Sequence, residues 1–246
     1  MKNLLNSIQR QHLILVCKAL QDDINSSSEN FCRDPSLDLQ AQREAAIVKV
    51  TLIVVYTKLW GKHYFAVDYE EMLTSNIGHP AAFNLANTVT IMYKAPAHID
   101  FSIYTDGSKT NEGTGSAYCF LKGPSTVHTW NRRLDARYTV YQAELSAIKA
   151  AITYARRNGI CKSTILIGSF SSLQPILSIE NKKKLFQDTQ RKLLTQSEAE
   201  RPKLIWVPAH VGIHGNEVAD QLAKETANDT NRIETPERLP KSYMKK

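Results

Sequence analysis

The strongest constraint on the fold is a change of hydrophobic period near the middle of the chain. Three stretches are rich in β-forming residues and are separated by turn residues: His98 to Thr105, Gly113 to Leu121 and Thr126 to Arg133. The next stretch, Thr139 to Arg157, repeats apolar residues at helical spacing and is followed by Gly159. The pattern predicts an antiparallel three-strand meander followed by an amphipathic helix.

The sequence beyond this helix alternates between short apolar runs and amphipathic runs. We expect two strands, at Thr164 to Ile167 and at Lys203 to Val207. We also expect a short helix at Ser171 to Ile179, a polar helix at Lys182 to Ser197 and a final helix at Asn216 to Ala227. This order predicts an α/β fold. Its five-stranded mixed sheet has a three-strand antiparallel meander, then alternating strands and helices packed on the sheet.

The regular patterning divides the chain into three parts. Residues 97–229 form the predicted domain, and residues 230–246, with two prolines and a basic end, are expected to be a disordered tail. Residues 1–96 are expected to be a mainly helical connecting segment. A helix is expected at Leu39 to Val55, while residues 61–96 are poorly patterned.

Composition limits the class of protein only weakly. The 246 residues carry 31 Lys and Arg against 24 Asp and Glu, a formal net charge of +7, which is compatible with a polyanionic partner. No uninterrupted apolar run of about 18 residues occurs, so no membrane span is expected. Cys17, Cys32, Cys119 and Cys161 form no C-x-x-C pair and are expected to be free thiols.

Three acids occupy positions of interest in the predicted domain. Asp106 ends the first strand, Glu144 precedes the sheet-facing Leu145, and Asp220 follows Ala219 in the last helix. Taken singly, each is more often a solvated charge or a cap. Gathered at one end of a sheet, they would need a cation, and oxygen ligands suit magnesium or manganese.

The residues around these acids form three motifs in order, namely Tyr104 to Ser108, Tyr141 to Ile148 and Trp206 to Asp220. In order, spacing and strand–helix context they resemble the ribonuclease H family over about Ile99 to Asp229. The version is most similar to the domain at the C-terminal end of reverse transcriptases from arthropod non-LTR retrotransposons. The resemblance implies an intracellular protein, cytoplasmic or nuclear, and we expect a monomer.

The resemblance also implies two-metal hydrolysis of the RNA strand of an RNA–DNA hybrid. Asp106, Glu144 and Asp220 match metal-binding acids of the family, which would hold two Mg²⁺ or Mn²⁺ ions about 4 Å apart. His210 matches a loop histidine that assists proton transfer or product release; the alternative is a surface histidine. The expected nucleic-acid contacts are Ser108, Gln142, Ser169 and Asn216, and for Ser108 and Gln142 the alternative is capping or a surface position.

One acid of the family pattern is missing. Gly168 stands where it should end the fourth strand, and no Asp or Glu lies between Glu144 and Glu180. A glycine supplies no ligand oxygen, so we expect an impaired nuclease. Two alternatives remain open: a catalytically inactive, nucleic-acid-binding relic of the same domain, and a scaffold for protein interactions.

Overall fold

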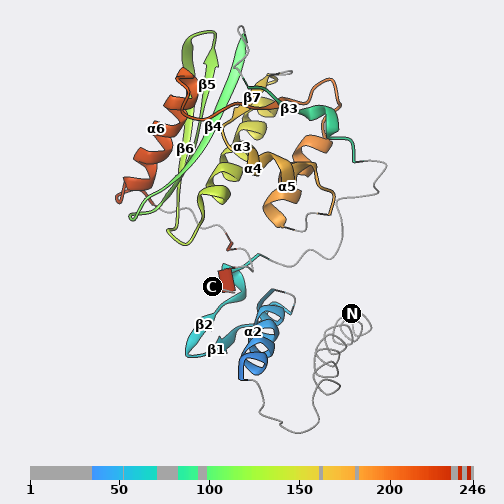
Figure 1. Cartoon of the computed structure of the whole chain (residues 1–246), viewed down its shortest axis with the longest axis vertical. Coiled ribbons are helices and arrows are strands. Elements are labelled where there is room, and N and C mark those ends of the chain that lie inside the picture. The colour runs from blue at the N-terminus through green and yellow to red at the C-terminus, as the bar shows by residue number, and fades with distance from the viewer. Residues whose placement is uncertain are drawn as a thin grey trace. The chain divides into compact units, whose positions relative to one another are not determined.

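The computed structural model describes residues 35–51, 53–70, 83–93, 99–160, 163–180, 183–233, 238–239 and 243–244. The chain divides into two compact units, residues 1–65 and residues 66–244 (Figure 1). Among the described residues, no helix has the length and apolar character needed to cross a bilayer. Cys119 is a buried free thiol, and the other three cysteines lie outside the described residues.

The first unit contains a helix and a two-stranded hairpin: α2 (Pro35–Thr51), β1 (Thr57–Leu59) and β2 (Lys62–Tyr64). Helical spacing predicts one shared face for Leu39, Ala46, Val50 and Ile53. Ala46 and Val50 are buried, whereas Leu39 and Ile53 are 46% and 41% exposed. The helix ends at Thr51, four residues before the predicted end. The β-branched run after Val50 explains the early stop, because such residues lose side-chain freedom in a helix.

The second unit is built on one mixed sheet with the strand order β3-β8-β7-β4-β5-β6. The meander consists of β4 (Phe101–Lys109), β5 (Thr114–Lys122) and β6 (Ser125–Leu134), all antiparallel. β7 (Thr164–Ile167) pairs in parallel with β4, and β8 (Lys203–Trp206) pairs in parallel with β7. The five predicted strands and the mixed α/β sheet are confirmed.

A sixth strand, β3 (Val89–Ile91), pairs in parallel with the outer edge of β8. The sheet therefore has six strands where the sequence predicts five. Three consecutive β-branched residues favour a strand here, but three residues are too few for alternation to be visible. Part of the expected connecting segment thus contributes to the sheet, while the boundary at residue 97 stays a prediction.

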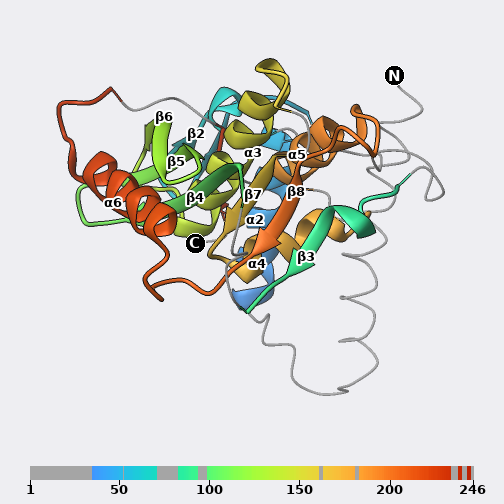
Figure 2. The ribbon, with the colours of Figure 1, turned by 90° about the horizontal axis from the view of Figure 1, so that it is seen from above.

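Helices cover both faces of this sheet (Figure 2). α3 (Val140–Arg157), α4 (Phe170–Leu173) and α5 (Lys184–Leu194) lie on one face, and α6 (His214–Asn228) lies on the other. Strand alternation distributes the core between the faces. Ile103 packs on the α3 side, and its neighbour Tyr104 packs on the α6 side.

The sheet-facing side of α3 is the stripe that the sequence predicts. Leu145, Ile148, Ile152 and Ala155 are at most 2% exposed. The helix begins with a capping box, in which Thr139 and Gln142 each bond the backbone N–H of the other. α3 is therefore fixed at its start by hydrogen bonds and along its length by apolar packing.

Part of the segment expected to be a disordered tail has a described position. Leu239 forms a parallel bridge with Tyr69, and its backbone N–H donates to the Asp68 carbonyl at 2.7 Å. Leu239 and Met244 are 1% and 5% exposed. At these residues the structure differs from the expected tail, because two apolar side chains are buried.

The close approach of α3 to β4 depends on the absence of a side chain at Gly107. A Cβ added there would lie 2.5 Å from the Glu144 backbone nitrogen and 2.9 Å from the Ala143 backbone carbon. We therefore expect Gly107→Ala to lower the free energy of unfolding by about 1–3 kcal/mol, measured by urea denaturation. The matched control is Gly168→Ala, since a Cβ at Gly168 meets no atom closer than 3.4 Å. We expect it to cost less than about 1 kcal/mol; equal losses in both variants would contradict this account.

Candidate functional site

The parallel pairing of β4 with β7 sets the position of the site. Thr105 lies opposite Ile167 in this pairing. Asp106 and Gly168 follow these two residues, so they lie side by side at the same level of the sheet. The missing acid of the family pattern thus falls beside the first acid.

Asp106 is partly buried at this level of the sheet. Its Oδ1 accepts a hydrogen bond from the Gly107 N–H at 2.8 Å. Burial, followed by the charges of Asp220 and Glu144, raises the pKa of Asp106 to about 7, although the Gly107 hydrogen bond opposes this rise. The structure therefore brings Glu144 and Asp220 within electrostatic range of Asp106.

Glu144 is held by two hydroxyl groups. Ser172 donates a short hydrogen bond to Glu144 Oε2, and Ser172 also bonds Ser169 Oγ at 3.0 Å. Burial raises the pKa of Glu144, and the hydroxyls of Ser169 and Ser172 partly offset that rise. Ser169, predicted as a nucleic-acid contact, lies here as a partner of the acid, and its contact with nucleic acid stays a prediction.

Asp220 has a cationic partner one helical turn away. Lys224 Nζ lies 2.6 Å from Asp220 Oδ2. The hydrogen bond and charge of Asp220 raise the pKa of Lys224. The half-exposed lysine can leave this pair at little cost, because solvent-exposed ion pairs contribute little to stability.

The surroundings of Gly168 would admit a side chain. An added Cβ would lie 3.4 Å from both Ala209 Cβ and Asn216 Oδ1, which is close but permitted contact. The Gly168 carbonyl accepts a hydrogen bond from Trp206 Nε1 at 3.0 Å, so the backbone is held in place. Asn216 Oδ1 is buried and has no hydrogen-bond partner among the described residues.

Asn216 is therefore placed differently from the other predicted nucleic-acid contacts. It is 3% exposed and lies behind Gly168, away from solvent. Gln142 and Ser108 are partly exposed, and Gln142 also performs the capping role that was its alternative. Sequence reasoning does not separate these cases, because exposure depends on how α6 packs.

His210 lies in the exposed loop between β8 and α6. Its backbone φ is 58°, in the left-handed region that non-glycine residues seldom adopt. Such conformations persist where the surrounding structure enforces them, and they concentrate at functional sites. The loop position agrees with the expected site-loop histidine, although its part in proton transfer stays a prediction.

The three carboxylates of the site have the right chemistry to bind a hard divalent cation, but their present positions do not suit one. Three carboxylates supply the oxygen ligands that Mg²⁺ prefers, and their crowding at Asp106 is what a cation would relieve. In the described ranges, however, no three His, Cys, Asp or Glu side chains are grouped so that they could hold one ion. Glu144 is turned to its serines and Asp220 to Lys224.

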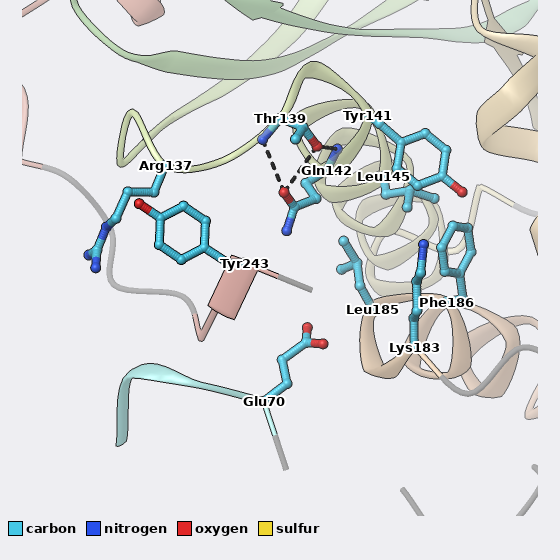
Figure 3. A pocket seen from close by; sticks show the side chains of 10 residues that line it. All are labelled: Glu70, Arg137, Thr139, Tyr141, Gln142, Leu145, Lys183, Leu185, Phe186 and Tyr243. Atoms are coloured by element: carbon cyan, nitrogen blue, oxygen red, sulfur yellow. Dashed lines mark hydrogen bonds between the residues drawn. The ribbon is translucent and has the colours of Figure 1, made fainter. Parts of the chain in front are cut away.

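A pocket of about 330 Å³ lies at the start of α3 (Figure 3). Its lining residues are Glu70, Arg137, Thr139, Tyr141, Gln142, Leu145, Lys183, Leu185, Phe186 and Tyr243. Burial, with a further contribution from the charge of Glu144, raises the pKa of Tyr141 to about 12, so this pocket residue lies within electrostatic range of Glu144.

Of the two cations of this pocket, sequence reasoning missed Arg137, whereas it considered Lys183 as a phosphate contact within a charge run that is more often a solvated face. Lys183 Nζ lies 5.7 Å from the Tyr141 ring centroid, and Arg137 pairs with Asp135 at 2.8 Å. Arg137 stands two residues before the capping Thr139, so its position next to a helix start could have marked it as a pocket residue. No local signal marks Glu70 or Tyr243, because distant parts of the chain bring them to the pocket.

The family model described as RNase H matches residues 99–228. Among solved structures, the chain is similar to RNase H1 from the halophilic archaeon Halobacterium salinarum NRC-1, with 22% identity and a TM-score of 0.39 over 51% of this chain and 96% of that chain. No curated protein matches.

Two further structures give comparable values. The N-terminal RNase H domain of Rv2228c from Mycobacterium tuberculosis, solved as a fusion with maltose-binding protein, is 21% identical, with a TM-score of 0.43 over 53% of this chain and 100% of that chain. LC11-RNase H1, isolated from compost by a metagenomic approach, is 17% identical, with a TM-score of 0.43 over 54% and 99%.

The raised pKa of Asp106 predicts a pH-dependent stability. The unfolded carboxyl loses its proton near pH 3.8, whereas the native one keeps it to about pH 7. The native state then binds more protons, so stability falls as pH rises between these values. In buffer with EDTA, we expect Asp106→Asn to remove on the order of 2–4 kcal/mol of this fall, measured by urea denaturation from pH 4 to 8.

Asp135→Asn is the matched control. A hydrogen bond from Arg137 lowers the pKa of Asp135, so this group stabilises the native state above about pH 4 and that stability is lost as pH falls. Between pH 4 and 8, Asp135→Asn should therefore leave the slope of the profile nearly unchanged, because its contribution changes only below about pH 4. An unchanged profile in Asp106→Asn would contradict the crowding of the acids.

Proposed function

Because this chain belongs to the ribonuclease H family, we propose that it binds RNA–DNA hybrids and hydrolyses their RNA strand, at a rate reduced by Gly168. The observation that carries the proposal is the partly buried Asp106, whose pKa is raised by its burial and by the charges of Asp220 and Glu144. Perturbed acids that interact in this way are typical of functional sites.

Divalent metal is the cofactor of this proposal, with two Mg²⁺ or Mn²⁺ ions in a complete site. Asp106, Glu144 and Asp220 would hold it. When bound, the metal would neutralise phosphate charge and lower the pKa of a water molecule. Asp106 would lose its proton on binding, Glu144 would exchange its serine hydroxyls for the ion, and Asp220 would leave Lys224.

The remaining residues would position the hybrid. Ser108, Gln142 and Ser169 lie near the acids, and Arg137 and Lys183 of the pocket can meet backbone phosphates. His210, on its exposed loop, is suited to exchange a proton with solvent or with the leaving group. Such contacts engage the backbone and read little base sequence.

Gly168 is the reason for proposing a reduced rate. A carboxylate at this position would stand beside Asp106 and would add one negative charge to the metal-binding set. The loss of one preorganised charged group can lower the rate by about 10²–10³. Steric exclusion does not explain the glycine, since the space accepts a Cβ.

A catalytically inactive, hybrid-binding domain is the second candidate function. Two observations favour it: the glycine at position 168, and the internal partners of two acids, Ser172 for Glu144 and Lys224 for Asp220. Binding through the basic and polar groups of the pocket needs none of the acids. Hybrid affinity without cleavage would distinguish this function.

The motifs also support a proposal about origin. Tyr104 to Ser108, Tyr141 to Ile148 and Trp206 to Asp220 are most similar to those of arthropod non-LTR retrotransposon reverse transcriptases. We propose that the chain derives from such an element. An RNA–DNA hybrid substrate then implies a cytoplasmic or nuclear location.

Restoring the acid tests the proposal directly. Gly168→Asp is expected to cleave an end-labelled RNA–DNA hybrid at least about 10²-fold faster than the unaltered chain, with Mg²⁺ or Mn²⁺. Gly168→Asn has nearly the same size without the charge and should give no gain. Denaturing gel electrophoresis of the labelled RNA measures the rate.

The other outcomes are equally informative. If both variants bind the hybrid and neither cleaves it, the inactive binding domain is the better account. Cleavage by the unaltered chain at the rate of Gly168→Asp would contradict the role given to Gly168. Addition of Asp106→Asn to Gly168→Asp should abolish the gain and excludes a contaminating nuclease.

A further inference from the structure

A cationic surface lies on the outer side of two packed helices, α3 and α5. Six cations form it, and we call them the α3–α5 cationic surface: Lys149, Arg156, Arg157, Lys184, Arg191 and Lys192. Asp188 is the acid that stands among them. The surface therefore carries a net formal charge of about +5, when the whole chain carries +7.

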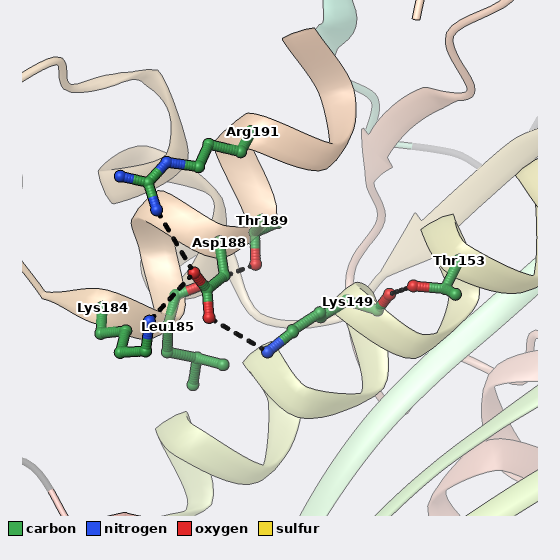
Figure 4. Close-up of polar contacts among 7 residues, drawn as sticks. All are labelled: Lys149, Thr153, Lys184, Leu185, Asp188, Thr189 and Arg191. Atoms are coloured by element: carbon green, nitrogen blue, oxygen red, sulfur yellow. Dashed lines mark hydrogen bonds and ion pairs between the residues drawn. The ribbon is translucent and has the colours of Figure 1, made fainter. Parts of the chain in front are cut away.

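One carboxylate is shared by three of these cations (Figure 4). Lys149, Lys184 and Arg191 lie 3.4, 3.6 and 3.9 Å from the Asp188 oxygens. Asp188 is 24% exposed, whereas the side chains of Lys184 and Arg191 are 39% and 46% exposed. A single negative charge cannot neutralise three, so this cluster keeps a positive field toward solvent.

The other three cations are less compensated still. Arg156 makes a long hydrogen bond to a neutral partner, Thr195, at 3.4 Å. Burial lowers the pKa of Lys192, and the charges of Lys149, Arg156 and Arg157 lower it further. Mutual repulsion of this kind favours a polyanion that would neutralise several cations together.

This surface is separate from the acids. Lys149 and Arg156 are seven residues apart, so they share one face of α3 about 10 Å from each other. Glu144 precedes Lys149 by five residues, which turns it about 140° around the helix, and Arg156 lies about 18 Å farther along the axis than Glu144. A hybrid held only at the acids would not need these cations.

We propose that the α3–α5 cationic surface binds the phosphate backbone of nucleic acid beyond the segment held at the acids. The inference rests on the proposed function, since it extends the same bound strand or duplex across the helices. A duplex carries one negative charge per about 1.7 Å of its axis, so it presents several phosphates at once to the cations of the two adjacent helices. An acidic protein surface seldom offers charge so densely, and nothing in the surface reads bases.

The test is hybrid binding by the full chain at two probe lengths. One RNA–DNA hybrid has about 8 base pairs, and the other has about 24 base pairs, about 80 Å at 3.4 Å per step. The variant is Arg156→Gln, Arg157→Gln and Lys192→Gln together, which leaves the ion pairs of Asp188 in place. The matched control is Lys49→Gln, Lys58→Gln and Lys62→Gln, which removes three exposed charges from the first unit.

Fluorescence anisotropy over a salt series measures affinity and its salt dependence. The triple variant should bind the long hybrid about 10- to 100-fold more weakly than the unaltered chain. The slope of log K against log salt should decrease in magnitude by about 2–3, because each lost phosphate contact accounts for about 0.9. The short hybrid and the control variant should keep the values of the unaltered chain. Circular dichroism and thermal melting establish that both variants are folded.

Each other result has a separate meaning. If the unaltered chain binds both hybrids but the triple variant loses nothing on the long one, this inference is overturned and the proposed function stands. If the unaltered chain binds neither hybrid, the proposed function itself fails. If polyglutamate binds with the same loss in the triple variant while the long hybrid does not, the surface accepts acidic protein and the nucleic-acid assignment is overturned.

Discussion

The parallel pairing of β4 with β7 is the constraint on which the site depends. This pairing puts Asp106 beside position 168 at one level of the sheet. Gly107, the next residue, has no side chain and so lets α3 approach, which brings Glu144 to the same place. α6 covers the other face and carries Asp220 into electrostatic range of Asp106. Each acid comes from a different element, and none is locally close to another in sequence.

Crowded carboxylates are costly, and the chain relieves the cost in three ways. Asp106 holds its proton to about pH 7, Glu144 accepts hydrogen bonds from serines, and Asp220 pairs with Lys224. Glycine at position 168 removes a fourth charge altogether. These contacts let the protein keep an acidic site folded, and a bound cation would have to compete with them. The same balance explains why loss of one acid can favour stability while it lowers activity.

Much of the domain could be predicted from its sequence because periodicity and turn residues agree there. The strand Thr164–Ile167 was predicted to the residue, and the apolar stripe of α3 from Leu145 to Ala155 is buried as expected. β3 was missed, because a three-residue strand is too short to show a period. Such strands gain their stability from pairing with a neighbour, which sequence patterns do not reveal.

The candidate site was predictable in its residues and less so in its arrangement. Family motifs named Asp106, Glu144, Asp220 and the position of Gly168, yet they did not indicate that Asn216 is buried behind Gly168. They also missed the pocket walls that Glu70 and Tyr243 supply. Burial and pocket shape arise from tertiary packing, which joins segments far apart in the chain.

The most direct measurement is the binding site of Mn²⁺ in solution. In a ¹⁵N-resolved NMR spectrum, a paramagnetic ion broadens the amide signals around it, and most strongly those nearest to it. The account predicts that substoichiometric Mn²⁺ broadens the amides of Gly107, Glu144 and Gly168 first, and that Asp106→Asn removes the effect. Broadening centred elsewhere, or unchanged in Asp106→Asn, would contradict the claim that these acids form one metal-binding site.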